Sequence, residues 1–160
     1  MSAIPTHISK HPNSLARNIA VQFLYQCMCE KLFYYSEPHF NHFVRSFEIS
    51  SKTSQLAVPL VEGSLNHAQE IDTMIQNHSD NWSIDRLMKT DLCTMKIACY
   101  EILYTDTPPK VIIDEAIELA KLYGSSKSAS FVNGVLEQIM IQKGKLIKEA
   151  KIDHGLLASQ

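Results

Sequence analysis

The chain has 160 residues, a formal net charge of −2 and an apolar content of 45%. That length fits one domain, which can bury a sizeable core without disulfides or metals. The slightly negative charge argues against a strongly basic nucleic-acid binder, although a local basic patch remains compatible with it.

The composition favours a cytoplasmic protein. The four cysteines lie close together along the sequence two by two, Cys27 near Cys29 and Cys93 near Cys99. Neither spacing is the C-x-x-C spacing of a zinc or redox site. We therefore expect structural thiols, no bound metal and no cofactor. No apolar run of about 18 residues could span a bilayer, and the N-terminus does not resemble a signal peptide.

Apolar spacing predicts helices throughout one domain over residues 13–149. Residues 1–12 contain two prolines and little periodicity, so they are expected to form a flexible N-terminal tail, and residues 150–160 a C-terminal tail. The first helix is expected to begin near Ser14 and to run to about Lys31.

Two helices are expected next, a short aromatic one over residues 37–47 and a longer one from Thr53 to about His78. The apolar residues of the longer helix suggest an inward face that consists of Leu56, Leu60, Leu65, Ile71 and Ile75.

In the second half of the chain, the apolar spacing predicts a short turn after Ser83 and three further helices. One begins near Thr90, the next at Pro109, and the last near Ser126. Proline at a helix start and glycine at Gly124, just after a helix, suit these boundaries.

The segment SASFVNGVLEQIM, residues 128–140, combines two conflicting signals. An Asn-Gly pair between apolar residues is typical of a hairpin, yet the apolar residues recur every four positions, as in a helix. We expect a helix in which Gly134 lies on a buried face and lets the alanine-rich face with Ala116 and Ala120 approach closely. The alternative is an exposed Asn-Gly pair that the helix tolerates.

Several motifs, in order and spacing, resemble the NusB family of transcription antitermination factors. They are ARNIAVQFLYQ near the N-terminus, then NWSIDRL, ACYEILY, DEAIELAKLYG and FVNGVL. The resemblance covers residues 15–26 and 81–139, which is about half of the chain.

The resemblance implies an all-α fold of about seven helices in two small bundles that pack together. It also implies a protein that is not an enzyme and that binds boxA, a single-stranded RNA element of ribosomal RNA operon leaders. Family members bind boxA together with NusE, a small-subunit ribosomal protein, and act with other Nus factors on the RNA polymerase elongation complex to suppress termination. A protein-interaction adaptor with weak or lost RNA binding is the alternative.

Single-stranded RNA is bound by cations that follow its backbone and by planar side chains under its bases. The basic N-terminal segment of the family corresponds here to KHPNSLAR, in which only Lys10 and Arg17 stand where several arginines are usual. The other RNA contacts that the resemblance implies are Lys110, Lys127 and Phe131. Phe131 is expected either to stack on a base or to belong to the core.

For NusE binding, the resemblance points to Tyr25 and Asp91. Asp91 is also explained as an acid in the first turn of a helix, where the helix dipole favours it. Glu101 lies within an apolar turn, so we expect it to pair with a cation such as Arg17 in a structural role.

An enzyme is not indicated, and no catalytic residue is predicted. His39 and His42 have helical metal-ligand spacing, but no carboxylate cluster completes a site. The chain has no glycine-rich phosphate loop and no nucleophile motif.

Overall fold

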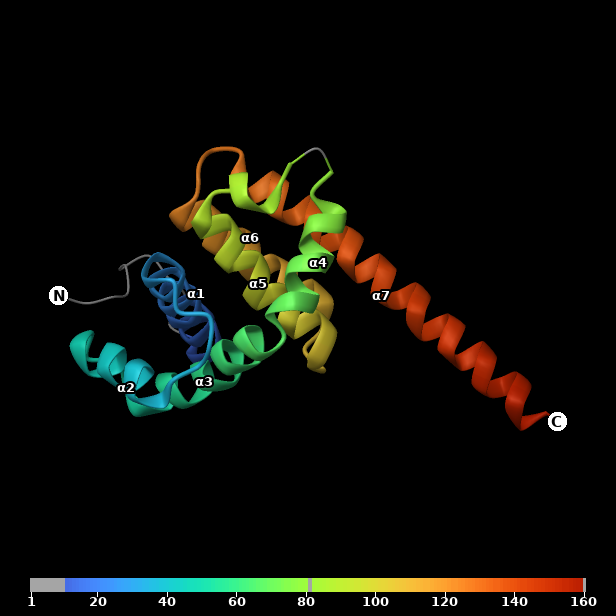
Figure 1. Ribbon diagram of the computed structural model, residues 1–160, viewed down its shortest axis with the longest axis horizontal. Helices are drawn as coiled ribbons and strands as arrows, with labels where there is room; N and C mark the ends of the chain where they lie inside the picture. Colours follow the sequence, from blue (N-terminus) through green and yellow to red (C-terminus); the bar gives the residue numbers. More distant parts are fainter. Residues whose placement is uncertain (1–10, 81, 160) are drawn as a thin grey trace.

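The computed structural model describes residues 11–80 and 82–159, and this part of the chain is helical without any strand (Figure 1). The expectation of an all-α fold is therefore confirmed, whereas Lys10 lies outside the described residues. None of the described helices is both long enough and apolar enough to cross a membrane. The helices are α1 (Pro12–Glu30), α2 (Glu37–Ser46), α3 (Ser51–Asn66), α4 (Ala68–His78), the 3₁₀ turn η1 (Ile84–Arg86), α5 (Lys89–Tyr104), α6 (Pro109–Tyr123) and α7 (Ser128–Ala158).

The helices pack around two apolar cores, as the two-bundle prediction required. One core is built mainly by α1, α2 and α3, and the other by α4, α5, α6 and α7. Helix α5 contributes to both, because Cys93 and Ile97 lie in the first core while Met95 and Cys99 lie in the second. Figure 1 shows α5 and α6 between α1 and the projecting part of α7.

The five predicted helix starts differ from the observed starts of α1, α3, α5, α6 and α7 by at most two residues. Side-chain caps are present at two of these starts. The ring of His11 accepts a hydrogen bond from the Asn13 amide at the start of α1, and the Ser50 hydroxyl accepts one from the Thr53 amide at the start of α3.

The prediction of a single helix from Thr53 to His78 is wrong, because the chain forms two helices that meet at His67. The His67 side chain contacts the Gly63 carbonyl, with 2.9 Å between Nδ1 and the oxygen, at the end of α3. The break allows α3 to pack on α1 in the first core, while α4 packs on α5 in the second.

The inward face expected for α3 is also shifted. Leu56 is exposed, while Leu60 and Leu65 are half-buried against the first core and α3 fully buries smaller residues that include Ala57, Val61 and Ser64. Small side chains at these positions let α3 lie close to α1. The prediction is confirmed for Ile71 and Ile75, which are buried in α4.

The close approach expected at Gly134 is wrong. Gly134 is exposed, and a Cβ atom placed on it would meet nothing within 4 Å. The face of α7 that enters the core carries Val132, Val135, Leu136 and Ile139, and the glycine lies beside it. The alternative of an exposed Asn-Gly pair is therefore confirmed for Gly134, whereas Asn133 is half-buried.

A close approach does occur at Gly63 of α3. This glycine is buried, and a Cβ atom on it would overlap the ring of Tyr100 in α5. The ring in turn stacks on Tyr104, with 5.5 Å between ring centroids.

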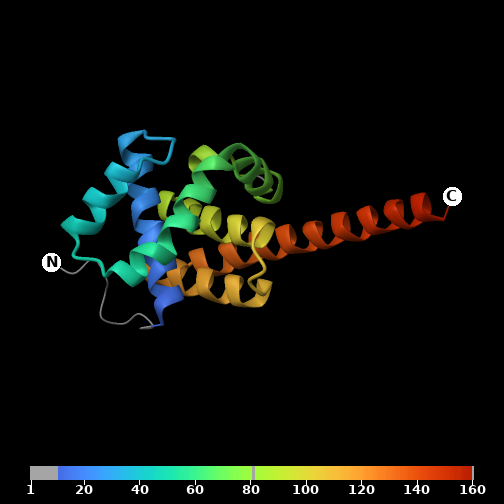
Figure 2. The same ribbon diagram turned by 90° about the horizontal axis from the view of Figure 1, so that it is seen from below.

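Helix α7 continues well past its last buried residue, Ile139, and runs away from the rest of the molecule (Figure 2). All residues from 145 to 159 are exposed. Residues 150–158, which were expected as a tail, form the end of this helix.

We predict that Gly134→Ala stabilises the protein by roughly 0.5–1 kcal/mol, because alanine costs less conformational entropy in a helix and meets nothing at this position. Gly63→Ala should instead destabilise it by about 1–3 kcal/mol, since the stacked ring of Tyr100 must move. Urea unfolding of both variants measures the effects. Equal stability losses at the two glycines would contradict this assignment.

Candidate functional site

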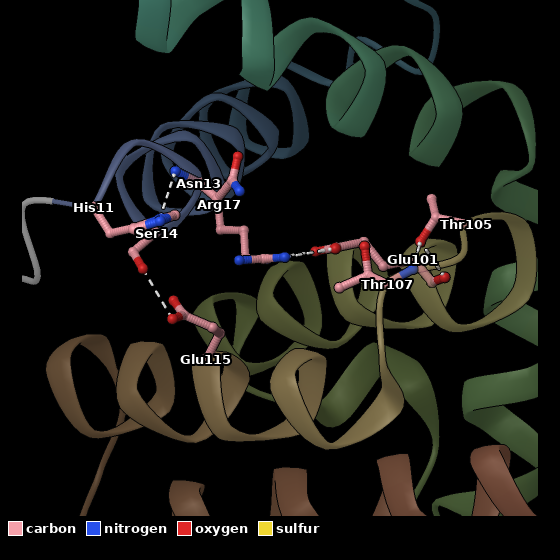
Figure 3. A network of polar contacts seen from close by, with 8 residues as sticks. All are labelled: His11, Asn13, Ser14, Arg17, Glu101, Thr105, Thr107 and Glu115. Atoms are coloured by element: carbon pink, nitrogen blue, oxygen red, sulfur yellow. Dashed lines mark hydrogen bonds and ion pairs between the residues drawn. The ribbon is translucent and has the colours of Figure 1, made fainter.

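A buried ion pair joins α1 to α5 (Figure 3). The guanidinium of Arg17 donates from Nε to Glu101 Oε1 at 2.7 Å and from Nη2 to Oε2 at 2.9 Å. Arg17 is 8% exposed and Glu101 3%. The hydrogen bonds to Glu101 raise the pKa of Arg17 above its ordinary value, against the opposing effect of burial. The structural pairing expected for Glu101 is confirmed.

A cavity of about 660 Å³ opens beside this pair, where α1, α3, the end of α5 and the start of α6 meet. Within it, the Ser14 hydroxyl donates to Glu115 at 2.8 Å and so holds the start of α1 against α6 (Figure 3). Lys110 is exposed in the first turn of α6, next to the lining residue Val111. The structure thus brings Arg17 and Lys110 to the same end of α6.

The other two predicted RNA contacts lie at the opposite end of α6. Lys127 is exposed and follows the last residue of that helix by four positions, and Phe131 lies one turn further along α7. A helix of this length is roughly 22 Å long. Between the two ends, α6 exposes the carboxylate of Asp114, which repels phosphate, and an ion pair between Lys121 Nζ and Glu118 Oε1 at 3.2 Å.

Phe131 is partly buried and meets both of its expected surroundings. It packs against the second core, and it also lines an open cavity with Trp82 and Gly134. Belonging to the core and offering a face to a base are therefore compatible at this position.

Asp91 lies in the first turn of α5 and is 5% exposed. One carboxylate oxygen accepts a hydrogen bond from the Ser128 hydroxyl at 2.8 Å, which links the start of α5 to the start of α7. The other oxygen is buried and has no hydrogen-bond partner among the described residues. Burial raises the pKa of Asp91, and the bond from Ser128 partly offsets this effect.

Tyr25 is 41% exposed and lines an apolar cavity of about 480 Å³ between α1, α2, the start of α5 and the end of α6. Thr90, which precedes Asp91, lines the same cavity, so the structure brings the two predicted partner-binding positions close together. Phe43 and Phe47 complete its aromatic wall, and the aromatic content of residues 37–47 was the only sequence signal for them.

Comparison with known proteins identifies the family. The family model described as the NusB family matches residues 14–140. The chain belongs to the NusB family. The match ends where α7 leaves the second core, so the projecting end of α7 lies outside it.

Individual NusB proteins show the same extent of similarity. The transcription antitermination protein NusB of Anaeromyxobacter dehalogenans strain 2CP-1 is 41% identical over 127 residues, which span 78% of this chain and 87% of that relative. The NusB of Thermodesulfovibrio yellowstonii is 37% identical over 134 residues, spanning 78% and 88%.

Solved NusB structures share the fold. A crystal form of T. maritima NusB superposes with a TM-score of 0.70 at 30% identity and covers 82% of this chain and 92% of that one. A chain from the crystal structure of antitermination factors NusB and NusE in complex with dsRNA superposes with a TM-score of 0.72 at 26% identity, covering 84% and 99%.

We predict that Arg17→Ala destabilises the protein by about 3–5 kcal/mol, because it leaves the Glu101 carboxylate buried without its partner. The double variant Arg17→Met with Glu101→Leu should recover most of that loss, since neither charge then remains in the core. Chemical unfolding of the two variants tests this. If the double variant is no more stable than Arg17→Ala, the loss does not arise from an unpaired charge.

We further predict that Ser128→Ala lowers the free energy of unfolding by about 1–3 kcal/mol at pH 7, because the ionised Asp91 loses its donor. The pKa of Asp91 in the folded state is already raised, and losing the donor raises it further. The destabilisation should therefore be largest above the folded pKa and shrink as the pH falls toward the ordinary aspartate range, where the acid is protonated in both states.

Unfolding by urea at pH 7 and pH 4 measures this difference, and Ser130→Ala on the exposed side of the same turn is the matched control. A loss at Ser128 that does not change with pH would show that the carboxylate is not involved.

Proposed function

We propose that this chain is a transcription antitermination factor that binds the boxA RNA of ribosomal RNA operon leaders together with NusE. The observation that carries the proposal is the NusB family match over residues 14–140, which contains every motif behind the resemblance. The similarity to a NusB chain crystallised with NusE and dsRNA supports both partners.

In this proposal, NusE docks at the apolar cavity beside Tyr25. The cavity is lined by four aromatic residues, of which Tyr25 is exposed, Phe47 and Tyr123 are half-buried and Phe43 is buried. Aromatic side chains are enriched at protein interfaces. Asp91 contributes from below the surface, because its hydrogen bond from Ser128 holds the starts of α5 and α7 together.

The RNA contacts fall into two groups, with Lys110 at one end of α6 and Lys127 and Phe131 at the other. Arg17 supports the first group indirectly, because its guanidinium is held by Glu101 and fixes the start of α1. Between the groups, the Asp114 carboxylate repels phosphate and the Lys121 ammonium is already paired with Glu118, so a phosphate path along α6 is disfavoured. We therefore expect NusE to supply cations that join the two groups.

The complex acts with other Nus factors on the RNA polymerase elongation complex in the cytoplasm, and the chain catalyses no reaction. The relatives are named as transcription antitermination proteins, which supports this role.

A protein-binding adaptor with weak or lost RNA binding is the second candidate. The exposed acids on α6 and the arginine-poor start of the chain favour it, because both reduce the attraction to RNA.

We predict that the free protein binds boxA RNA weakly, with a shallow dependence on salt, and that NusE raises the affinity and steepens this dependence. Each phosphate contact on a single strand contributes roughly −0.7 to the slope of log affinity against log salt concentration. Lys110→Ala and Lys127→Ala should each reduce the slope by about that amount. Fluorescence anisotropy of labelled RNA at several salt concentrations measures it.

Lys148→Ala is the matched control, since this lysine is exposed on the projecting end of α7 and outside the family match. Tight and steeply salt-dependent binding by the protein alone would refute the need for NusE. A stable complex with NusE that has no RNA affinity would establish the adaptor instead.

A further inference from the structure

The end of α7 projects beyond the rest of the molecule and carries an exposed apolar stripe (Figure 2). Leu146 is 51% exposed and Leu157 70%, and Ala150 between them is exposed as well. Spacings of four and seven residues place these three side chains on one side of the helix. Ile139, seven residues before Leu146, is buried in the second core. The three residues, which we call the α7 stripe, therefore prolong the side of α7 that faces the core.

A helix end with such a stripe gains little stability in water. Isolated helices shorter than about 12–15 residues are marginal, because packing supplies most of the stability of helices in proteins. The fully exposed part of α7, residues 145–158, is about this long. Adjacent exposed apolar side chains on one element are also typical of an interaction surface. We therefore expect another apolar surface to cover the α7 stripe.

An open groove of about 520 Å³ lies where the stripe begins, between α4 and α7. Gln142 lines the groove from α7, and the residues that α4 contributes include Met74 and Glu70. Gln142 lies four residues before Leu146, so the groove and the stripe are on the same side of α7. A helix that packs along the stripe toward the core therefore enters the groove.

The length of the projecting part suits a second copy of the same helix. Residues 142–158 extend over roughly 24 Å. When two copies of α7 lie antiparallel and overlap along this length, the end of each helix reaches the groove of the other. Leu157 of one copy then lies opposite Gln142 of the other copy. Because a two-fold axis relates the copies, the same contact fills both grooves.

The charges favour this antiparallel register. Asp153 interrupts the stripe, and in the antiparallel overlap it lies opposite Leu146 of the other copy, one turn from Lys143. The Lys143 ammonium donates to the Ile102 carbonyl near the end of α5, and its further N–H groups can donate to this carboxylate. Symmetry forms the ion pair twice. In a parallel pair, by contrast, Asp153 would face Asp153 and Lys143 would face Lys143, which is destabilising.

We propose that the projecting end of α7 binds a second copy of this chain. The two helices form an antiparallel pair in which each helix end occupies the groove between α4 and α7 of the other copy. The inference goes beyond the proposed function and does not depend on it, because the projecting end lies outside the family match.

Sedimentation equilibrium of the full chain, without NusE or RNA, tests the pairing. We expect a dimer, and Leu146→Asp should raise its dissociation constant at least about tenfold, because the new carboxylate faces Asp153. Ile152→Asp is the matched control, since Ile152 is 61% exposed on the same segment but on a different side of the helix. The control should change the dissociation constant less than about twofold. Circular dichroism should show equal helix content in both variants.

Cysteine cross-linking tests the direction of the two helices. Leu146→Cys and Asp153→Cys are prepared separately, each with Cys29→Ser to remove the exposed native thiol. The antiparallel register predicts a disulfide between the two variants when they are mixed and oxidised. Either variant alone should give little product, because like positions lie apart in this register.

A chain that stays monomeric at all concentrations would overturn the proposal, and so would equal effects of Leu146→Asp and Ile152→Asp. Efficient cross-linking within a single variant would show a parallel pair and would also overturn it. If the chain is monomeric and Leu146→Asp weakens NusE binding, the stripe belongs to the interface with NusE. The pairing proposal then fails while the proposed function stands.

Discussion

The buried ion pair between Arg17 and Glu101 is the constraint on which the arrangement of the two bundles depends. A charge inside an apolar core is tolerated only when its partner is held in good geometry, and two hydrogen bonds between these side chains provide it. The pair ties α1, the centre of the first core, to α5, which belongs to both cores. The relative position of the bundles is set by this contact together with the apolar surface of α5.

With α1 and α5 held in this way, the functional surfaces appear at the ends of the helices. The start of α1 meets the start of α6 beside the ion pair, and the end of α1 meets the start of α5 at the apolar cavity that contains Tyr25. The link between Asp91 and Ser128 then places the start of α7 next to the start of α5. The proposed protein-binding surface and part of the proposed RNA-binding surface thus lie near one end of α6, which suits joint binding of two partners.

The glycines of the chain illustrate two different uses of a missing side chain. Gly63 lets the ring of Tyr100 lie against α3, so it serves packing between helices. Gly134 faces open space beside an exposed tryptophan and a half-buried phenylalanine. It therefore makes the helix less stable than an alanine would, without allowing a closer packing contact. A local loss of stability without a packing reason is typical of a binding surface.

Much of this protein was determined by its sequence alone, because local chemistry controls where helices begin and which family motifs are present. The apolar spacing and the polar or proline residues before it located five helix starts to within two residues, and the position of Glu101 within an apolar turn required a cation such as Arg17. The tertiary structure decided the break at His67, the buried face of α3 and the exposure of Gly134. Apolar periodicity predicts a face only when a helix buries its largest side chains, and α3 buries small ones against α1. A cavity formed by residues from α4, the following turn and α7 depends on how distant segments pack, and spacing along one helix carries no information about that.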